Sequence, residues 1–179
     1  MSDHSISIVP RQSRYPNSTA KAREILDWLI AKDIIKPTLS DCILGSSNGY
    51  AISDGAKEVT VFPSSLPFHL TVNGLEIITE RQVFDTGQNS LDELICPNCT
   101  TNIAFSDLDF NAWSNHESDN FACPQCGHES EIHDYTFHPD WGFSDLGFTF
   151  WNWPDFTDDF IDEFTLKLSC DISIVYCHV

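Results

Sequence analysis

The chain has 179 residues, 41% hydrophobic and 12% aromatic, which is enough for an ordinary core with a small insert and excludes a disordered acidic tail. Its formal net charge is −18, but the charge is uneven. Between Arg81 and Lys167 no lysine or arginine occurs, whereas the same stretch holds 17 acidic residues. Because nucleic acids are bound largely through lysine and arginine, this balance argues against a nucleic-acid partner. It favours either simple solubility or the capture of a basic protein.

Cysteine usage and hydropathy predict a cytoplasmic protein. The chain has seven cysteines, an odd number, and four of them stand in two C-x-x-C pairs, which suit a metal better than a secreted disulfide framework. The N-terminus carries no apolar signal region, and no apolar run approaches the ~20 residues of a membrane span. We therefore expect a reducing compartment and no membrane partner.

The N-terminal part predicts a strand followed by a helix. Residues 5–10 alternate and are β-branched, as in a strand. Residues 20–32 carry apolar side chains at three- and four-residue steps, the pattern of a helix packed on a core. Ser18 or Thr19 is placed to cap this helix, and Pro37 prevents its continuation.

Short strands separated by turns are expected to follow. They are predicted at residues 42–44, 50–52, 59–62, 68–72 and 75–79. The dipeptide Asn73-Gly74 lies between the last two and predicts a two-residue hairpin, because both residues tolerate positive φ. This half of the chain therefore predicts a helix on a largely antiparallel sheet.

The C-terminal part has the same strand–helix–strand character. Residues 147–153 predict a strand, and Pro154 ends it. Thr157 is placed to cap a helix that runs to about Leu168, with acidic residues in the first turn where they favour the helix dipole. Residues 171–179 predict a last strand.

These elements predict an α+β fold with an insert. We expect residues 1–90 and 137–179 to pack as one domain, a helix on an antiparallel sheet, and residues 91–136 to form a zinc-ribbon insert. The polar, turn-rich residues 86–95 place the first boundary.

Two cysteine knuckles define the insert. They are Cys96-Pro97-Asn98-Cys99 and Cys123-Pro124-Gln125-Cys126, and each pair places two thiolates at two corners of a tetrahedron. The 23 residues between the knuckles fit a hairpin that returns the chain to the metal. Proline after the first cysteine of each pair, and Gly127 after the last, favour the tight turns.

The knuckles resemble those of zinc ribbons of the rubredoxin type, over about forty of the 179 residues. The first knuckle departs from that pattern because Thr100 replaces the usual glycine. The resemblance implies Cys96, Cys99, Cys123 and Cys126 as the ligands of one structural zinc ion. Four thiolates leave no open position for water, so we expect no catalysis at the metal. Iron would also fit four thiolates, and two pairs of structural or redox cysteines are the other interpretation.

A run of histidines and carboxylates follows the second knuckle. One interpretation is a second metal site, and with it a metal-dependent enzyme using the cluster from His133 to Asp145. The spacing matches no catalytic signature, and surface residues beside the insert are the plainer explanation. No nucleophile motif or phosphate-binding loop occurs, and the pair Asp107 and Asp109 is too little to suggest a hydrolase. His128 is also an alternative fourth ligand. The run comprises His128, His133, Asp134, His138, Asp140 and Asp145.

Half of the chain's 22 aromatic residues, eleven, lie between Tyr135 and Phe164. Core packing explains most of them. Neighbouring rings on one strand face opposite sides, so four rings are expected to form an exposed patch with an acidic rim, as protein interfaces do. The expected partner-binding residues are Trp141, Trp151, Trp153 and Phe156 in the patch and Asp140, Asp145, Asp155, Asp158, Asp159 and Asp162 in the rim.

The sequence favours a non-catalytic, acidic zinc-binding protein that sequesters a basic protein. The most specific form of this hypothesis is an immunity protein that covers the cationic cleft of a bacterial toxin, since the chain resembles acidic immunity proteins in charge and size. Two alternatives stay open, namely the metal-dependent enzyme and a structural zinc subunit of a larger assembly.

Overall fold

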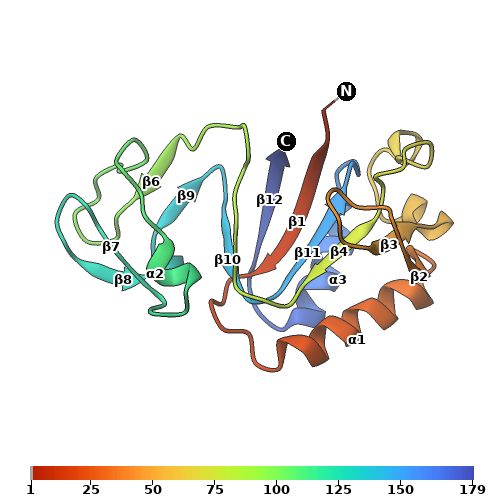
Figure 1. The fold of residues 1–179 in the computed structure, drawn as a ribbon, viewed down its shortest axis with the longest axis horizontal. Coiled ribbons are helices and arrows are strands. Elements are labelled where there is room, and N and C mark those ends of the chain that lie inside the picture. Colours follow the sequence, from red (N-terminus) through yellow and green to blue (C-terminus); the bar gives the residue numbers. More distant parts are fainter. Residues whose placement is uncertain (1) are drawn as a thin grey trace.

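A six-stranded antiparallel sheet is the centre of the larger lobe of the computed structural model, which describes residues 2–179 (Figure 1). Its strand order is β12-β1-β11-β4-β3-β2, so the two ends of the chain lie side by side in it. The predicted α+β class is confirmed. The strands are β1 (His4–Pro10), β2 (Ile35–Ser40), β3 (Gly49–Ile52), β4 (Leu75–Ile78), β11 (Gly147–Trp151) and β12 (Ile172–His178).

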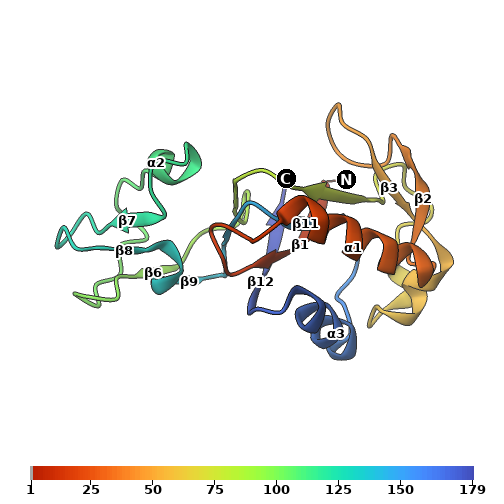
Figure 2. The same cartoon turned by 90° about the horizontal axis from the view of Figure 1, so that it is seen from below.

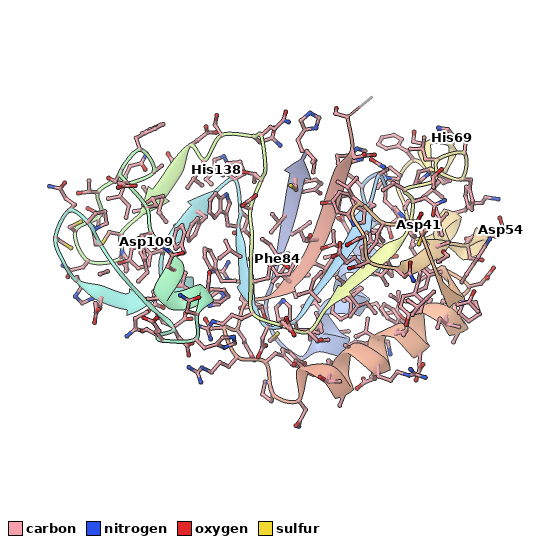
Figure 3. The ribbon with its side chains drawn as sticks, viewed as in Figure 1. Asp41, Asp54, His69, Phe84, Asp109 and His138 are labelled. Atoms are coloured by element: carbon pink, nitrogen blue, oxygen red, sulfur yellow. The ribbon has the colours of Figure 1, made fainter. Side chains whose placement is uncertain are left out.

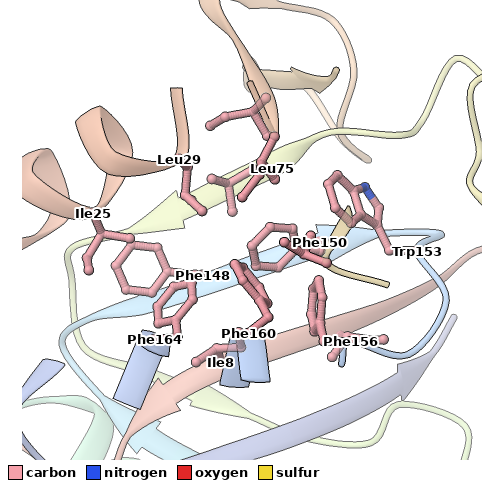
Figure 4. Close-up of a cluster of buried hydrophobic side chains, with 14 of the residues drawn as sticks. Ile8, Ile25, Leu29, Leu75, Phe148, Phe150, Trp153, Phe156, Phe160 and Phe164 are labelled. Atoms are coloured by element: carbon pink, nitrogen blue, oxygen red, sulfur yellow. The ribbon is translucent and has the colours of Figure 1, made fainter. Parts of the chain in front are cut away.

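Two helices, α1 (Ser18–Ala31) and α3 (Asp158–Leu168), cover one face of this sheet. The face is apolar because β1 and β11 place Ile6 opposite Phe150 and Ile8 opposite Phe148. Figure 4 shows these rings between the helices and the strands, with further phenylalanines from α3. No helix among residues 2–179 combines the length and the apolar character needed to cross a bilayer.

The other face of the sheet carries buried polar side chains beside a small apolar contact where it meets the rest of the chain. Ser5, Ser7 and Thr149 are buried there, and the Ser7 and Thr149 hydroxyls share a hydrogen bond of 2.8 Å. Strand β5 (Gln82–Phe84) pairs with β10 (Gly142–Ser144), and Phe84 packs against Val9 on β1. This pair of short strands therefore joins the sheet to the second lobe.

The second lobe holds the four cysteines of the two knuckles and lies to one side of the sheet in both views (Figures 1 and 2). We call residues 93–138 the cysteine module. It opens and closes with the paired strands β6 (Glu93–Ile95) and β9 (Thr136–His138). Between them lie α2 (Asn111–Ser114), β7 (Asn120–Ala122), β8 (Glu129–Glu131) and a 3-10 turn at Ile132–Asp134. Two further 3-10 turns, at Asp54–Glu58 and Pro63–Ser65, belong to the sheet lobe.

Each lobe has a hydrophobic cluster of its own. The cluster of the second lobe includes Trp113, Tyr135 and Phe143, all about 1% exposed, and Val83 packs against its edge. It therefore reaches beyond residues 91–136 in both directions along the chain. The division into residues 1–90, 91–136 and 137–179 stays a prediction.

The two long helices were predicted well, but only one of their caps was. At α3, Thr157 accepts a hydrogen bond from the Phe160 N–H, as expected. At α1 the cap position is Asn17, whose φ is 54° and whose side chain makes no capping bond, so the expected cap by Ser18 or Thr19 is wrong. Asparagine tolerates the left-handed region better than most residues do.

Between α1 and the cysteine module, several predicted strands are absent. Residues 42–44 and 68–72 form bends and turns, and 59–62 contribute a single bridge at Thr60. Asn73-Gly74 is therefore not a hairpin turn, and both of its N–H groups instead donate to the Cys42 carbonyl. Two strands in this region were not predicted, namely Gln82–Phe84 (β5) and β2, which contains Pro37. As an edge strand, β2 needs no ladder hydrogen bond from that residue.

Arginines from outside the cysteine module hold it against the sheet. The segment just after β1 supplies Arg11, which donates from Nη1 to the Ser173 hydroxyl (3.0 Å) on β12 and from Nη2 to the His133 carbonyl (3.1 Å). Its guanidinium also faces Asp140 at 3.7 Å. One side chain thus links a central strand, the edge strand and the module.

Arg81, just before β5, is the buried member of this set. Its side chain is 1% exposed, it pairs with Asp119, and it donates to the Ser118 carbonyl at 3.1 Å. The guanidinium lies 4.1 Å from the ring centroid of Trp113, a cation–π contact. Arg14 binds the same carboxylate from the exposed side at 3.0 Å. Burial alone would raise the pKa of Asp119, but the hydrogen bonds from Arg81 and Arg14 outweigh it and lower the pKa.

A serine completes the contact. The Ser13 hydroxyl donates to Glu131 at 2.6 Å and accepts from the Trp113 indole N–H at 3.0 Å. We call Arg11, Ser13, Arg14 and Arg81, with the groups they bind, the arginine seam. Because its cations come from other parts of the chain, part of the module's negative charge is neutralised within the molecule.

Two arginines that share Asp119 allow a matched test of the seam. Arg81→Ala removes a buried ion pair and a ring contact, and we expect it to lower the free energy of unfolding by about 2–4 kcal/mol. Arg14→Ala removes the exposed pair, with a side chain 64% exposed, and should cost under about 1 kcal/mol. Urea unfolding followed by tryptophan fluorescence measures both, and equal losses would contradict the assigned roles.

Candidate metal centre

The two knuckles have the same backbone geometry, each at the end of a short strand. Cys96 follows β6 and Cys123 follows β7. In the first knuckle the Asn98 N–H points to the Cys96 sulfur at 3.4 Å, and in the second the Gln125 N–H points to the Cys123 sulfur at 3.4 Å. Such N–H groups stabilise thiolates, which are the form of cysteine that binds metals.

Each knuckle is closed by a residue in the left-handed region. The Thr100 N–H donates to the Cys96 carbonyl at 3.0 Å, and the Gly127 N–H donates to the Cys123 carbonyl at 2.8 Å. Their φ values are 59° and 74°. The threonine therefore adopts the turn that glycine adopts in the second knuckle, and the departure from the zinc-ribbon pattern leaves the geometry unchanged. A β-branched residue is strained in this conformation.

The four sulfurs lie at the separations of a metal tetrahedron. The Sγ atoms of Cys96 and Cys126 are 3.8 Å apart, as are those of Cys99 and Cys123. All four sulfurs lie within 4.8 Å of one another. A tetrahedral ion with bonds of about 2.3 Å to sulfur has edges of about 3.8 Å. The seven cysteines are all free thiols, so these four form a possible metal site with four sulfur ligands.

The site is half buried, and its thiols are unequal. Cys96 and Cys123 are buried, whereas Cys126 is exposed. Hydrogen bonds from the Thr101 side chain and backbone lower the pKa of Cys99 to about 6, and burial raises the pKa of Cys123 to about 11. A metal requires all four as thiolates, so its binding releases the protons of the more basic thiols and is pH-dependent.

The second metal site that was one interpretation of the histidine and carboxylate run is not formed. Among residues 2–179 the four cysteines are the only group of three or more metal-binding side chains close enough to share an ion. His133 Nδ1 bonds Glu131 at 2.9 Å, Asp140 faces Arg11, and an Asp145 oxygen accepts from the Tyr15 N–H at 2.7 Å. These groups are therefore used in local contacts. His128 does not join the cysteine group either.

The four aromatic rings expected in one exposed patch are dispersed, which corrects that expectation. Trp153, fully buried, and Phe156, 7% exposed, belong to the main core in Figure 4. Trp151 points to the polar face, is 9% exposed, and donates from its indole N–H to Glu76 at 3.0 Å. Trp141 alone is half exposed, and it lies in the other lobe, stacked on Phe137 with 5.6 Å between ring centroids.

The six aspartates of the expected rim are divided in the same way. Asp140 and Asp145 are half buried and engaged by Arg11 and Tyr15. Burial raises the pKa of Asp140 although Arg11 opposes it. The other four are exposed on α3 or just before it, in the sheet lobe, and are Asp155, Asp158, Asp159 and Asp162. No single rim brings the six together.

Sequence reasoning missed how the exposed acids are distributed. Asp85, Asp107 and Asp109 are exposed beside the half-buried rings of Phe110 and Trp141, where the two lobes meet. The signal in the sequence was the pair Asp107 and Asp109 just before Phe110. The sequence did not show that the pairing of β5 with β10 brings Asp85 and Trp141 to the same place.

The chain matches no protein-family model, no curated protein and no solved structure. The likeness to zinc ribbons therefore rests on the knuckle residues and on the geometry of their sulfurs.

The left-handed turn at Thr100 gives a test of the knuckle geometry. Thr100→Gly removes the strain but adds flexibility to the unfolded chain, so we expect a net stabilisation of about 0.5–1 kcal/mol. Gly127→Thr places the same residue in the matching turn, where no atom lies near an added Cβ, and should destabilise by a similar amount. Thermal unfolding of the metal-loaded protein should show opposite shifts of roughly 1–4 °C. Shifts of the same sign would contradict equivalent turns.

Proposed function

We propose that the four cysteines hold one structural zinc ion, as in a zinc ribbon. Four sulfur donors around a small tetrahedral site suit zinc, and thiolate ligation leaves no position for water or substrate. The surroundings favour a structural role as well. Tyr135, 1% exposed, donates its hydroxyl to the Phe121 carbonyl at 2.8 Å directly beneath the second knuckle. The metal therefore fixes both knuckles on a small aromatic core.

Metal removal tests this part of the proposal. Protein purified under reducing conditions should contain about one zinc per chain by elemental analysis, and a red, iron-containing protein would contradict zinc. Cys123→Ser, at a buried ligand, should abolish binding and loosen residues 93–138, because a module of this size depends on its metal. Cys42→Ser, at a buried cysteine outside the site, is the control and should retain the metal.

We propose further that the protein is a non-catalytic binding protein for a basic protein partner. The observation that carries this proposal is the contrast between two sets of acids. Asp119 and Asp140 face arginines of the seam. The second set has no ion-pair partner among residues 2–179. It comprises Asp85, Asp107 and Asp109, together with the acids of α3 except Glu163. An unneutralised surface of one sign accelerates association with a partner of the opposite sign.

A narrower form of this proposal is an immunity protein that covers the cationic cleft of a bacterial toxin. Net charge and chain length support it, and no feature of the fold is specific to a toxin. A cytoplasmic location belongs to the same proposal, and seven free thiols agree with a reducing compartment.

The partner proposal predicts a strong dependence on salt. The tagged, zinc-loaded chain should retain from its native cells a partner of basic isoelectric point. Titration of the purified partner at 50 and 500 mM salt should show an affinity at least about tenfold weaker at the higher concentration, because exposed charges are screened. An acidic partner, or an affinity that does not change with salt, would contradict the proposal.

A further inference from the structure

An open groove of about 600 Å³ lies where the cysteine module meets β5. Its lining combines aromatic rings with carboxylates. Phe110 and Trp141 contribute half-buried rings, with 5.9 Å between their centroids, and Val83 adds an apolar side chain from β5. Asp107 and Asp109 come from the segment before α2. Ligand sites commonly have such volumes and an apolar lining with a few charged groups.

The carboxylates of this groove are free to bind a cation. Asp85 and Asp109 each use one oxygen to accept a nearby backbone N–H, from Gly87 and Asn111, at 2.8 Å. Among residues 2–179, none of the three groove aspartates has an ion-pair partner. The three arginines near the module all point to the seam instead.

The module already binds one arginine of its own chain by the same chemistry. Arg81 stacks on Trp113 at 4.1 Å and pairs with Asp119. The groove offers a similar combination, an aromatic ring beside aspartates, with no arginine of the chain in it. A planar guanidinium matches this combination better than an ammonium group does, because it stacks on a ring and can bond a carboxylate with two N–H groups.

We propose that this groove binds an arginine side chain of the basic protein partner, with the guanidinium on Trp141 or Phe110 and its N–H groups on Asp107 and Asp109. The inference rests on the proposed function and locates the contact on the cysteine module. The acids of α3 then contribute to the approach of the partner and do not touch the bound arginine.

The test uses two peptides and two double variants of the full, zinc-loaded chain. The probes are acetyl-Gly-Arg-Gly-Arg-Gly-amide and its lysine counterpart. Asp107→Asn with Asp109→Asn removes two groove charges, and the amide oxygen of the second can keep the bond to Asn111. Asp41→Asn with Glu58→Gln removes two exposed charges in the sheet lobe, away from both α3 and the groove, and Figure 3 shows Asp41 and Asp109 on opposite sides of the molecule.

The arginine peptide should shift the Trp141 indole signal in an NMR titration, a signal identified by its absence in Trp141→Phe. The groove variant should bind the peptide at least about tenfold more weakly, and the control variant should change less than about twofold. Circular dichroism checks that both double variants are folded. If the groove variant is unfolded, Asp85→Asn takes its place. The lysine peptide should bind more weakly than the arginine peptide.

Three outcomes would overturn the groove assignment, namely equal weakening in both double variants, equal binding of the two peptides, or no peptide binding by the unchanged chain. Titration of the purified partner against the same variants separates this failure from that of the proposed function. If partner binding is sensitive to salt but unaffected by the groove variant, the basic-partner proposal stands and the assignment of the groove as the arginine site is wrong. Loss of partner binding in the groove variant alone supports both.

Discussion

The contact between Arg81 and Asp119 is the interaction on which the arrangement of the two lobes depends. A charged side chain that is 1% exposed is tolerated only where its charge is compensated. Here the compensation comes from the cysteine module, whose own sequence contains no arginine or lysine. Arg11 and Ser13 extend the same contact to Glu131, His133 and the edge strand. The module is therefore electrostatically incomplete without the sheet lobe, and the two lobes depend on each other.

The cysteine knuckles supply the second constraint. The module has short strands of three residues each and one brief helix, too little regular structure to fix its chain by backbone hydrogen bonds alone. Its core is a cluster of rings around Trp113 and Phe143. The cluster of four cysteines lies at one end of this core and the arginine seam at the other. Along the chain, the segment that carries Asp107 and Asp109 lies between these two ends, after Cys99 and before Asp119.

Local patterns predicted much of this fold, and long-range pairings account for what they did not predict. Thr157 and the apolar spacing of α3 are determined by neighbours in sequence, and both appear as expected. The four cysteines were recognisable for the same reason. The strand predicted at residues 147–153 also forms, but it ends at Trp151. The hairpin predicted at Asn73-Gly74 was wrong because the segment before it forms turns instead of a strand. The prediction that Trp153 is exposed was wrong. Its indole N–H donates at 2.8 Å to the carbonyl of Asn73, a residue distant in sequence, inside the core.

The distribution of charge was also difficult to predict from the sequence, because long-range contacts decide it. Counted along the sequence, residues 82–166 carry 17 acids and no base, which suggests one continuous acidic surface. In three dimensions, arginines from outside this stretch pair with Asp119 and Asp140, and Lys32 reaches Glu163 at 2.9 Å. The acids that keep no ion-pair partner among residues 2–179 include Asp158, Asp159 and Asp162 on α3 and the three aspartates of the groove beside Trp141. In the groove, unpaired carboxylates adjoin half-buried aromatic rings. That combination suits the binding of a cation, whereas exposed carboxylates alone merely attract one.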